Sequence, residues 1–167
     1  MKKINFKKLT QQTFSGYGCF ANMLKPEGFK IGEGGLEFYR DMIKLSLGNE
    51  AGVSFSIAKA MNTNKKVVIS LIEYHSKCGE AILPLDGDVI ISIAPATPPG
   101  DTPVDRIEAF LVPVGTMVVL NPGVWHGAPL LYKCQSANIL IGLPERTYAN
   151  DSVVFEIPEK DCIEIEL

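Results

Sequence analysis

From residue 53 onward, apolar and polar positions alternate in short runs that are separated by turn residues. Residues 53–58 read Val-Ser-Phe-Ser-Ile-Ala, and this period of two predicts a strand with one buried face. Residues 67–72 are rich in Val and Ile, which also favours a strand. Similar apolar runs occupy residues 81–85, 89–94, 107–112, 117–120, 137–143 and 153–157. Short strands at this spacing predict a β-sandwich or barrel.

The turns between these runs carry their own signals. Asp86-Gly87-Asp88 lies between two apolar runs, and an Asp-Gly in that position predicts a hairpin. Residues 95–103 hold four prolines and one glycine, so we expect a loop there.

The N-terminal third has a mixed pattern. Thr10 is a candidate cap for a short helix, and Gly16-Tyr17-Gly18 would end it. Residues 25–35 are rich in glycine and predict a loop, whereas residues 36–47 allow either a helix or strands. We therefore expect one domain over residues 1–167, with an N-terminal extension over about 1–50 and a barrel over about 51–160.

Composition narrows the class of protein. The chain is 46% hydrophobic and 21% charged, which is ordinary for a soluble globular protein. Its net charge of −3, without a basic block, argues against nucleic acid as a partner. No apolar run is long enough for a membrane span or a signal peptide, so we expect a cytoplasmic protein away from membranes. The four cysteines form no CxxC pair, which argues against a zinc knuckle and favours free thiols.

The chain has two histidines, and both stand in short polar settings. Glu73 and His75 are alternate residues, so on a strand they would point to the same side. Glu80 follows after a length that allows the chain to turn and return on a neighbouring strand, and His126 follows a Pro-Gly turn. We expect these four residues to form one cluster, in a layout similar to that of cupin-type barrels. Imidazole and carboxylate groups suit Zn²⁺, Mn²⁺, Ni²⁺ or Fe²⁺, but the same residues could instead make a metal-free polar pocket.

Three further residues are candidates for binding a substrate. Arg40 and Lys59 could hold a substrate carboxylate, Arg as a fork and Lys as a point charge. Trp125, next to His126, could form a wall of the pocket or belong to the core. The chain has no GxSxG motif, so triad chemistry of the hydrolase type is unsupported.

Several motifs, taken in order, resemble the ureidoglycolate lyase family of the cupin superfamily almost from end to end. They are Leu-Thr-Gln-Gln-Thr-Phe-Ser-Gly-Tyr-Gly at 9–18, Tyr-Arg-Asp at 39–41, Ile-Ala-Lys-Ala at 57–60, Glu-Tyr-His at 73–75 with Glu-Ala-Ile-Leu-Pro-Leu-Asp-Gly at 80–87, Ala-Phe at 109–110, and Gly-Val-Trp-His at 123–126. The resemblance implies a mainly β, cupin-type double-stranded β-helix (a jelly-roll barrel), commonly homodimeric. It also implies the cleavage of ureidoglycolate, a small molecule of allantoin degradation, to glyoxylate and urea. In that reaction His75, His126, Glu73 and Glu80 would be metal ligands or acid–base groups.

The chain also departs from the family pattern. Leu120-Asn121-Pro122 stands where the family usually has Tyr-His-Arg, and Gly127 replaces a frequent second histidine. The family glutamine is Glu80 here. The arginine of its Arg-Ala-Phe motif falls at Glu108, although Arg106 is near enough to take over substrate binding. These departures predict a divergent member. They leave open a metal-dependent enzyme for another small hydroxy acid, keto acid or sugar acid, or a non-catalytic ligand-binding protein, because function belongs to the site rather than the fold.

Overall fold

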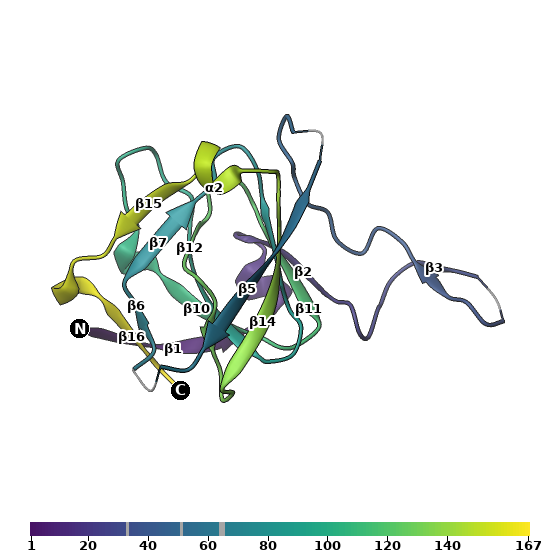
Figure 1. Ribbon diagram of the computed structural model, residues 1–167, viewed down its shortest axis with the longest axis horizontal. Coiled ribbons are helices and arrows are strands. Elements are labelled where there is room, and N and C mark those ends of the chain that lie inside the picture. Colours follow the sequence, from purple (N-terminus) through teal and green to yellow (C-terminus); the bar gives the residue numbers. More distant parts are fainter. Residues whose placement is uncertain (33, 51, 64–65) are drawn as a thin grey trace.

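The computed structural model describes residues 1–32, 34–50, 52–63 and 66–167. Within them, two curled β-sheets face each other and form a barrel (Figure 1). The larger sheet has the order β15-β7-β12-β9-β10-β1-β16-β6, with β13 beside β9, and the smaller sheet has the order β2-β11-β8-β14-β5. The predicted mainly β, jelly-roll barrel is therefore confirmed.

The bounds of the elements are as follows. The larger sheet contains β1 (Lys2–Lys8), β6 (Val68–Ile69), β7 (Leu71–Tyr74), β9 (Val89–Ala94), β10 (Glu108–Val112), β12 (Trp125–His126), β13 (Leu130–Leu131), β15 (Val153–Glu156) and β16 (Ile163–Glu166). The smaller sheet contains β2 (Gly18–Asn22), β5 (Ser54–Met61), β8 (Glu80–Pro84), β11 (Thr116–Leu120) and β14 (Ser136–Leu143). A separate ribbon joins β3 (Lys30–Ile31) to β4 (Phe38–Tyr39). The helices are α1 (Gln11–Phe14) and α2 (Thr147–Asn150), with 3₁₀ turns at Val104–Arg106 and Glu159–Asp161.

The middle of the larger sheet, at β9, is buried on both faces. In β9, Ile91 and Ile93 point into the core between the sheets, whereas Ile90 and Ala94 point into a second core on the opposite side. Because a strand alternates its side chains, a continuous apolar run fits a strand that is covered twice. The second core is completed by residues of β6, β16 and the segment that leads to β16.

The core between the sheets is closed at one point by α1. Thr10 caps this helix as predicted, with its side chain accepting a hydrogen bond from the Thr13 amide. The cap brings Phe14 into the core, where its ring meets Phe110 edge-on at 5.3 Å and Phe20 at 5.9 Å. The short helix thus stabilises the barrel by adding an aromatic side chain.

One prediction about local structure is wrong. The turn at residues 86–88 does not form a hairpin, because β8 and β9 belong to different sheets. Its carboxylates instead accept hydrogen bonds from β14 and from the turn between β10 and β11. Asp86 accepts hydrogen bonds from the backbone and side-chain amides of Asn138, and Asp88 accepts one from Val114. Residues 36–47, for which the pattern allowed either a helix or strands, form no helix and contain one strand, β4.

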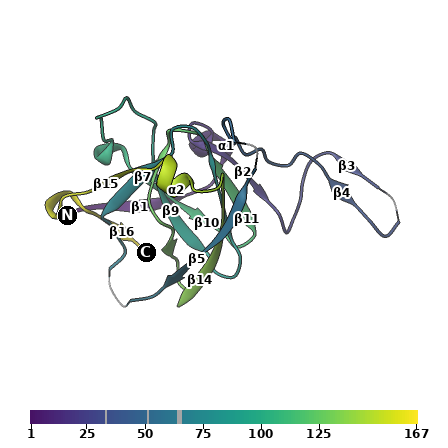
Figure 2. The same ribbon diagram turned by 45° about the horizontal axis from the view of Figure 1, so that its top comes forward.

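The predicted N-terminal extension divides into two parts. Its strands β1 and β2 belong to the two sheets, β1 lying parallel between β10 and β16. The segment from residue 23 to residue 50, which we call the arm, contains β3 and β4 and projects from the barrel (Figures 1 and 2). Residue 51, where the barrel was predicted to begin, lies outside the described residues. In the described ranges, neither helix has the length or the apolar character to cross a membrane.

Candidate active site

Glu73, His75, Glu80 and His126 meet at one end of the space between the two sheets. β12 pairs with β7 so that His126 lies directly opposite Glu73, and His75 follows the last residue of β7. Glu80 begins β8, which lies in the smaller sheet and not beside β7. The expectation that Glu80 returns on a neighbouring strand is therefore wrong, since it approaches the histidines from the opposite sheet.

Glu80 stands between the two imidazole rings. Its Oε2 atom is 3.1 Å from His75 Nε2 and 2.9 Å from His126 Nε2. The ring centroids of the histidines are 5.3 Å apart. The three side chains are almost enclosed, because His75 and His126 are each 4% exposed and Glu80 is 8% exposed.

The backbone orients both histidines through their other ring nitrogens. His75 Nδ1 lies 2.8 Å from the Asp151 carbonyl, and His126 Nδ1 lies 3.0 Å from the Val124 carbonyl. A carbonyl oxygen only accepts a hydrogen bond, so each Nδ1 carries a proton and donates it. Both rings therefore present Nε2 to the cluster, the arrangement by which proteins commonly orient a metal-binding histidine.

The charges of Glu80, His75 and His126 strongly affect one another. Burial alone would raise the pKa of Glu80, but the two histidines outweigh it and lower that pKa from 4.5 to about 2. Burial would likewise lower the pKa of His75 and of His126, but the Glu80 carboxylate and the backbone carbonyls raise both above 6.5. The protein alone therefore favours an ionised carboxylate between protonated imidazoles.

These residues also fit a divalent metal ion. One ligand atom each from Glu73, His75 and His126 lie within 4.8 Å of one another. Although His126 Nε2 is close to Glu80, it is buried without a hydrogen-bond partner in the described part of the chain. When the ring is neutral with its proton on Nδ1, this buried nitrogen has a lone pair that, beside carboxylates, is suited to bind Ni²⁺, Mn²⁺, Zn²⁺ or Fe²⁺.

Sequence reasoning missed two residues that support the cluster. The Asp151 carboxylate accepts hydrogen bonds from the backbone amides of Ser76 at 3.0 Å and Lys77 at 2.8 Å, and from the Ser76 hydroxyl. These contacts hold the pKa of Asp151 below its ordinary range, despite the opposing effect of burial. Ser152 donates its hydroxyl to Glu73. Both residues are more than seventy positions away from their partners, and no local motif indicates them.

Replacing Asp151 by alanine should destabilise the protein by about 2–3 kcal/mol, because two backbone amides and a hydroxyl lose a charged acceptor. The free energy of unfolding in urea measures this loss. Glu166→Ala is the control: it removes an exposed ion pair with Lys3 at 3.4 Å and should cost less than about 1 kcal/mol. Equal losses in the two variants would contradict the role given to Asp151.

The structure does not bring the predicted substrate-binding cations into the cluster. Lys59 is exposed on β5 and is near Asp86, at the far end of β8 from Glu80. Arg40 is exposed on the arm, where its guanidinium lies 4.3 Å from the centre of the Phe29 ring.

Trp125 and Arg106 also lie apart from the cluster. Trp125 follows the strand alternation and points away from His126 into the second core, where its indole donates to Thr97. Arg106 is exposed and forms an ion pair with Asp101 at 3.1 Å. A role in substrate binding stays a prediction for all four residues.

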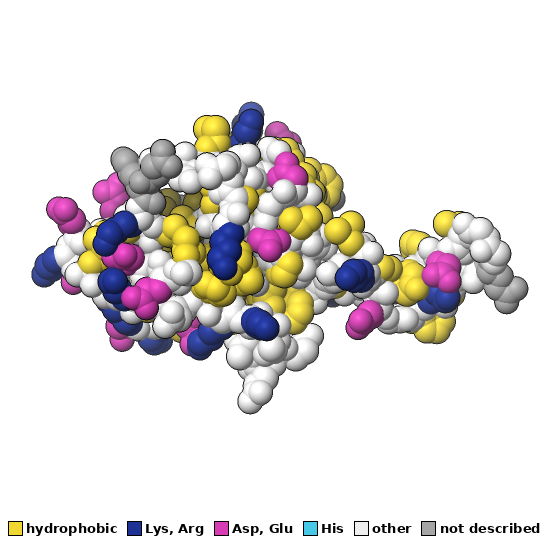
Figure 3. All heavy atoms as spheres, turned by 90° about the horizontal axis from the view of Figure 1, so that it is seen from below, with side chains coloured by type: hydrophobic (Ala, Val, Ile, Leu, Met, Phe, Trp, Pro, Cys, Tyr) yellow, Lys and Arg dark blue, Asp and Glu magenta, His cyan; other side chains and the backbone are white. Residues whose placement is uncertain are grey.

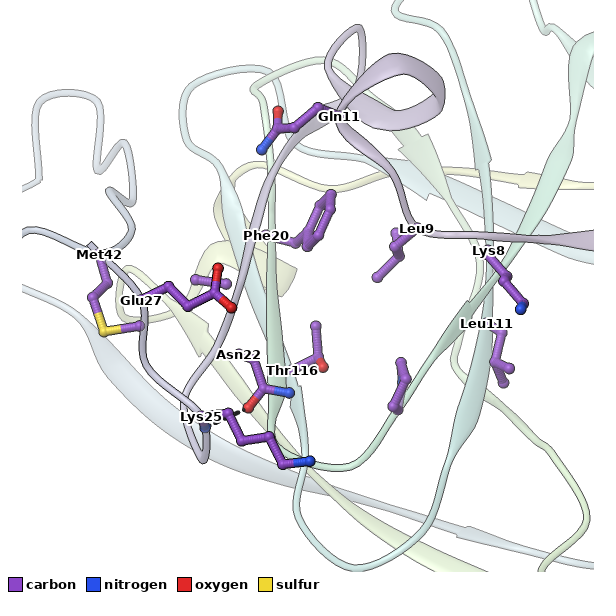
Figure 4. Close-up of a pocket in the computed structure, with 12 residues that line it drawn as sticks. Lys8, Leu9, Gln11, Phe20, Asn22, Lys25, Glu27, Met42, Leu111 and Thr116 are labelled. Carbon is purple, nitrogen blue, oxygen red and sulfur yellow. Dashed lines mark hydrogen bonds between the residues drawn. The ribbon is translucent and has the colours of Figure 1, made fainter.

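A hollow lies elsewhere, at the root of the arm (Figure 4). Its volume is about 730 Å³, and it lies between β2, the residues after β1, and the turn that joins β10 to β11. Leu9, Phe20 and Leu111 form apolar parts of its wall, and Lys8, Lys25 and Glu27 are among its charged residues. It contains none of the four cluster residues.

A barrel of two sheets that holds histidines and carboxylates between them has the architecture of the cupins. Its fold is similar to that of a dTDP sugar isomerase from Desulfovibrio desulfuricans, with a TM-score of 0.52 and 13% identity over 86% of this chain and 87% of the isomerase.

The family model described as Ureidoglycolate lyase matches residues 1–161, so the chain belongs to the ureidoglycolate lyase family. Its relatives include ureidoglycolate lyases from Rhodobacter capsulatus and Salmonella typhimurium. The first is 29% identical over 76% of this chain and 78% of the relative, and the second is 28% identical over 74% and 77%. The predicted membership of a divergent chain is thereby confirmed.

Proposed function

We propose that this protein cleaves ureidoglycolate to glyoxylate and urea. The observation that carries the proposal is the buried Glu80 carboxylate between His75 and His126, with Glu73 beside them, in a chain that belongs to the ureidoglycolate lyase family. The relatives bear the name of this activity at 27–29% identity.

The cluster supplies the two proton transfers that the reaction needs. A carboxylate, from Glu73 or Glu80, accepts the proton of the substrate hydroxyl, and the O–H electron pair becomes the second bond of the glyoxylate carbonyl. The C–N bond breaks with its electron pair going to the urea nitrogen. A protonated imidazole, from His75 or His126, donates a proton to that nitrogen. Acid and base groups held in this way typically contribute a rate increase of about 10²–10⁴-fold.

Glu73, His75, Glu80 and His126 are the residues that would hold a divalent metal ion. When bound, such an ion would polarise the oxygen atoms of the substrate and orient its α-hydroxy acid group. The backbone contacts at Nδ1 would keep both histidines in the ligating tautomer. Glu73 and Ser152 are only partly buried, so we infer that the substrate enters from their side.

A second candidate is a related activity on another small hydroxy acid, keto acid or sugar acid. It is favoured by the residues beside His126. Asn121 stands where family members usually carry a histidine, Pro122 and Gly127 have no side-chain donor where they usually carry an arginine and often a second histidine, and Glu80 adds a charge. A side chain at Gly127 would also collide with Ser92, since a Cβ atom there would lie 2.5 Å from the Ser92 hydroxyl.

We further propose a homodimer in the cytoplasm that acts in allantoin degradation. The resemblance to the family supports the dimer and the pathway.

The direct test is glyoxylate release from ureidoglycolate, corrected for spontaneous decay of the substrate. We expect release in proportion to enzyme concentration, with urea formed in equal amount. No release above the spontaneous rate at high enzyme concentration would overturn the proposal, and turnover of another hydroxy acid would then favour the second candidate.

Adding Ni²⁺, Mn²⁺ or Zn²⁺ in large excess over Kd should raise the melting temperature of metal-free protein by about 5 °C or more, because the ion binds only the folded cluster. Differential scanning calorimetry measures the shift. His126→Ala should abolish it, whereas Lys133→Ala, at an exposed position away from the cluster, should leave it unchanged. If none of the three ions raises the melting temperature, the metal site is excluded.

A further inference from the structure

The outer face of the smaller sheet is largely apolar, although it faces away from the barrel core; its polar members are Lys59 with Asn138, and Ser136 beside Met61. On its inner face Ala58, Ile82 and Ile139 belong to the core between the sheets or pack against it. The alternate residues therefore point outward. Rows of outward-pointing neighbours run across the strands of this sheet. One row contains Phe55, Gly142, Ala81, Val119 and Cys19, and another contains Ile57, Leu140 and Leu83. Antiparallel sheets with one wet face normally carry polar residues there.

The edge of this face at β5 is left open. Phe55 is 64% exposed, Ile57 is 55% exposed and Met61 is 65% exposed. β5 is also the last strand of the smaller sheet, so nothing in the described chain pairs with its outer edge.

The arm presents a second set of uncovered apolar side chains. Phe29 is 61% exposed, Leu36 is 72% exposed and Phe38 is 55% exposed. Two-stranded ribbons are at best marginally stable alone, yet this one projects from the barrel without packing on it (Figure 1). Figure 3 shows hydrophobic side chains along the arm and on the adjoining surface of the barrel.

We propose that a second copy of this chain covers both surfaces, its arm and outer sheet face packing against those of the first copy. The inference rests on the homodimer of the proposed function and assigns its interface. A twofold dimer would cover both surfaces at once. In such a dimer the contact is isologous, which means that the same patch of each subunit takes part in it.

Size and charge also favour a second copy. Three phenylalanines of about 200 Å² each leave about 350 Å² uncovered at their observed exposures. With the other exposed apolar side chains, the surface approaches the roughly 800 Å² per partner of a stable interface. The sequence of the arm holds four cations (Lys25, Lys30, Arg40, Lys44) and five anions (Glu27, Glu33, Glu37, Asp41, Glu50), so two identical arms can meet without strong repulsion.

The interface is connected to the active site. The arm returns to the barrel past the loop that joins His75 to Glu80, where the Gly79 amide donates to the Ser46 carbonyl at 2.8 Å. Gly48, with a φ of +63°, packs against the Lys77 carbonyl. A partner that fixes the arm therefore also fixes the loop between two cluster residues.

Sedimentation equilibrium of the full chain tests the inference. We expect wild-type protein at twice the 18.2 kDa mass of one chain. Ile57→Lys on the sheet and Phe38→Lys on the arm should each weaken the dimer about 30-fold or more, the effect of losing a central interface residue. The matched control is Leu71→Lys, which places the same charge at a 40% exposed strand position of the larger sheet and should leave the dimer intact.

The outcomes are distinct. A monomeric wild-type protein, or dimers that both variants leave unchanged, would overturn the inference. Dissociation by Ile57→Lys alone would overturn the part assigned to the arm. If Ile57→Lys fails to fold, as judged by circular dichroism, Phe38→Lys carries the test, because it lies outside the barrel. A dimer without lyase activity would refute the proposed activity but not the interface, whereas a fully active wild-type monomer would refute the interface alone.

Discussion

Replacing His126 by alanine should lower the rate of glyoxylate release from ureidoglycolate by about 10³-fold. His126 is 4% exposed, and its Nε2 atom faces Glu80 at 2.9 Å without an aligned hydrogen bond. The variant removes the group that is best placed to donate a proton to the leaving nitrogen or to bind a metal ion. Steady-state kinetics with saturating ureidoglycolate, with and without added metal, measures the effect.

Two controls make this result specific. Lys3→Ala removes an exposed side chain that pairs with Glu166, far from the cluster in the strand order, and should keep the wild-type rate. The melting temperature of His126→Ala should show that the variant is folded at the assay temperature. A folded His126→Ala protein with more than a tenth of the wild-type rate would show that the chemistry does not depend on this histidine.

Replacing Phe110 by alanine should destabilise the protein by about 3–5 kcal/mol. Phe110 is fully buried between the sheets and meets the rings of Phe14 at 5.3 Å and Tyr17 at 5.9 Å. The truncation leaves a cavity and removes both edge-on contacts. Small proteins have a free energy of unfolding of only about 5–15 kcal/mol, so this loss is a large part of the total stability.

Urea unfolding monitored by circular dichroism measures this loss. Tyr148→Ala is the matched control, because it removes an aromatic ring that is 75% exposed on α2 and should change stability by about 0.5 kcal/mol or less. A Phe110→Ala variant as stable as the control would show that the barrel can refill this cavity.

Local pattern was sufficient to predict the strands that carry a long apolar run or a period of two. β5, β8, β9, β10, β11, β14 and β15 all lie within a few residues of their predicted bounds, because each carries an apolar run or a period of two. The Thr10 cap was predicted for a similarly local reason, since the side chain and the amide it binds are three residues apart. β1, β2 and β16 were missed, because their stability comes from strands far along the chain.

The sequence by itself therefore determined the class of fold, the family and the four residues of the cluster. Only the tertiary structure decided how the strands divide between two sheets. That division turned the predicted hairpin at residues 86–88 into a connection between layers and brought Glu80 to the histidines from the opposite side. It also placed Trp125 in the second core and recruited Asp151, whose partners lie more than seventy residues away. The physical reason is that alternation fixes which residues share a face of a strand, whereas long-range pairing fixes what that face meets.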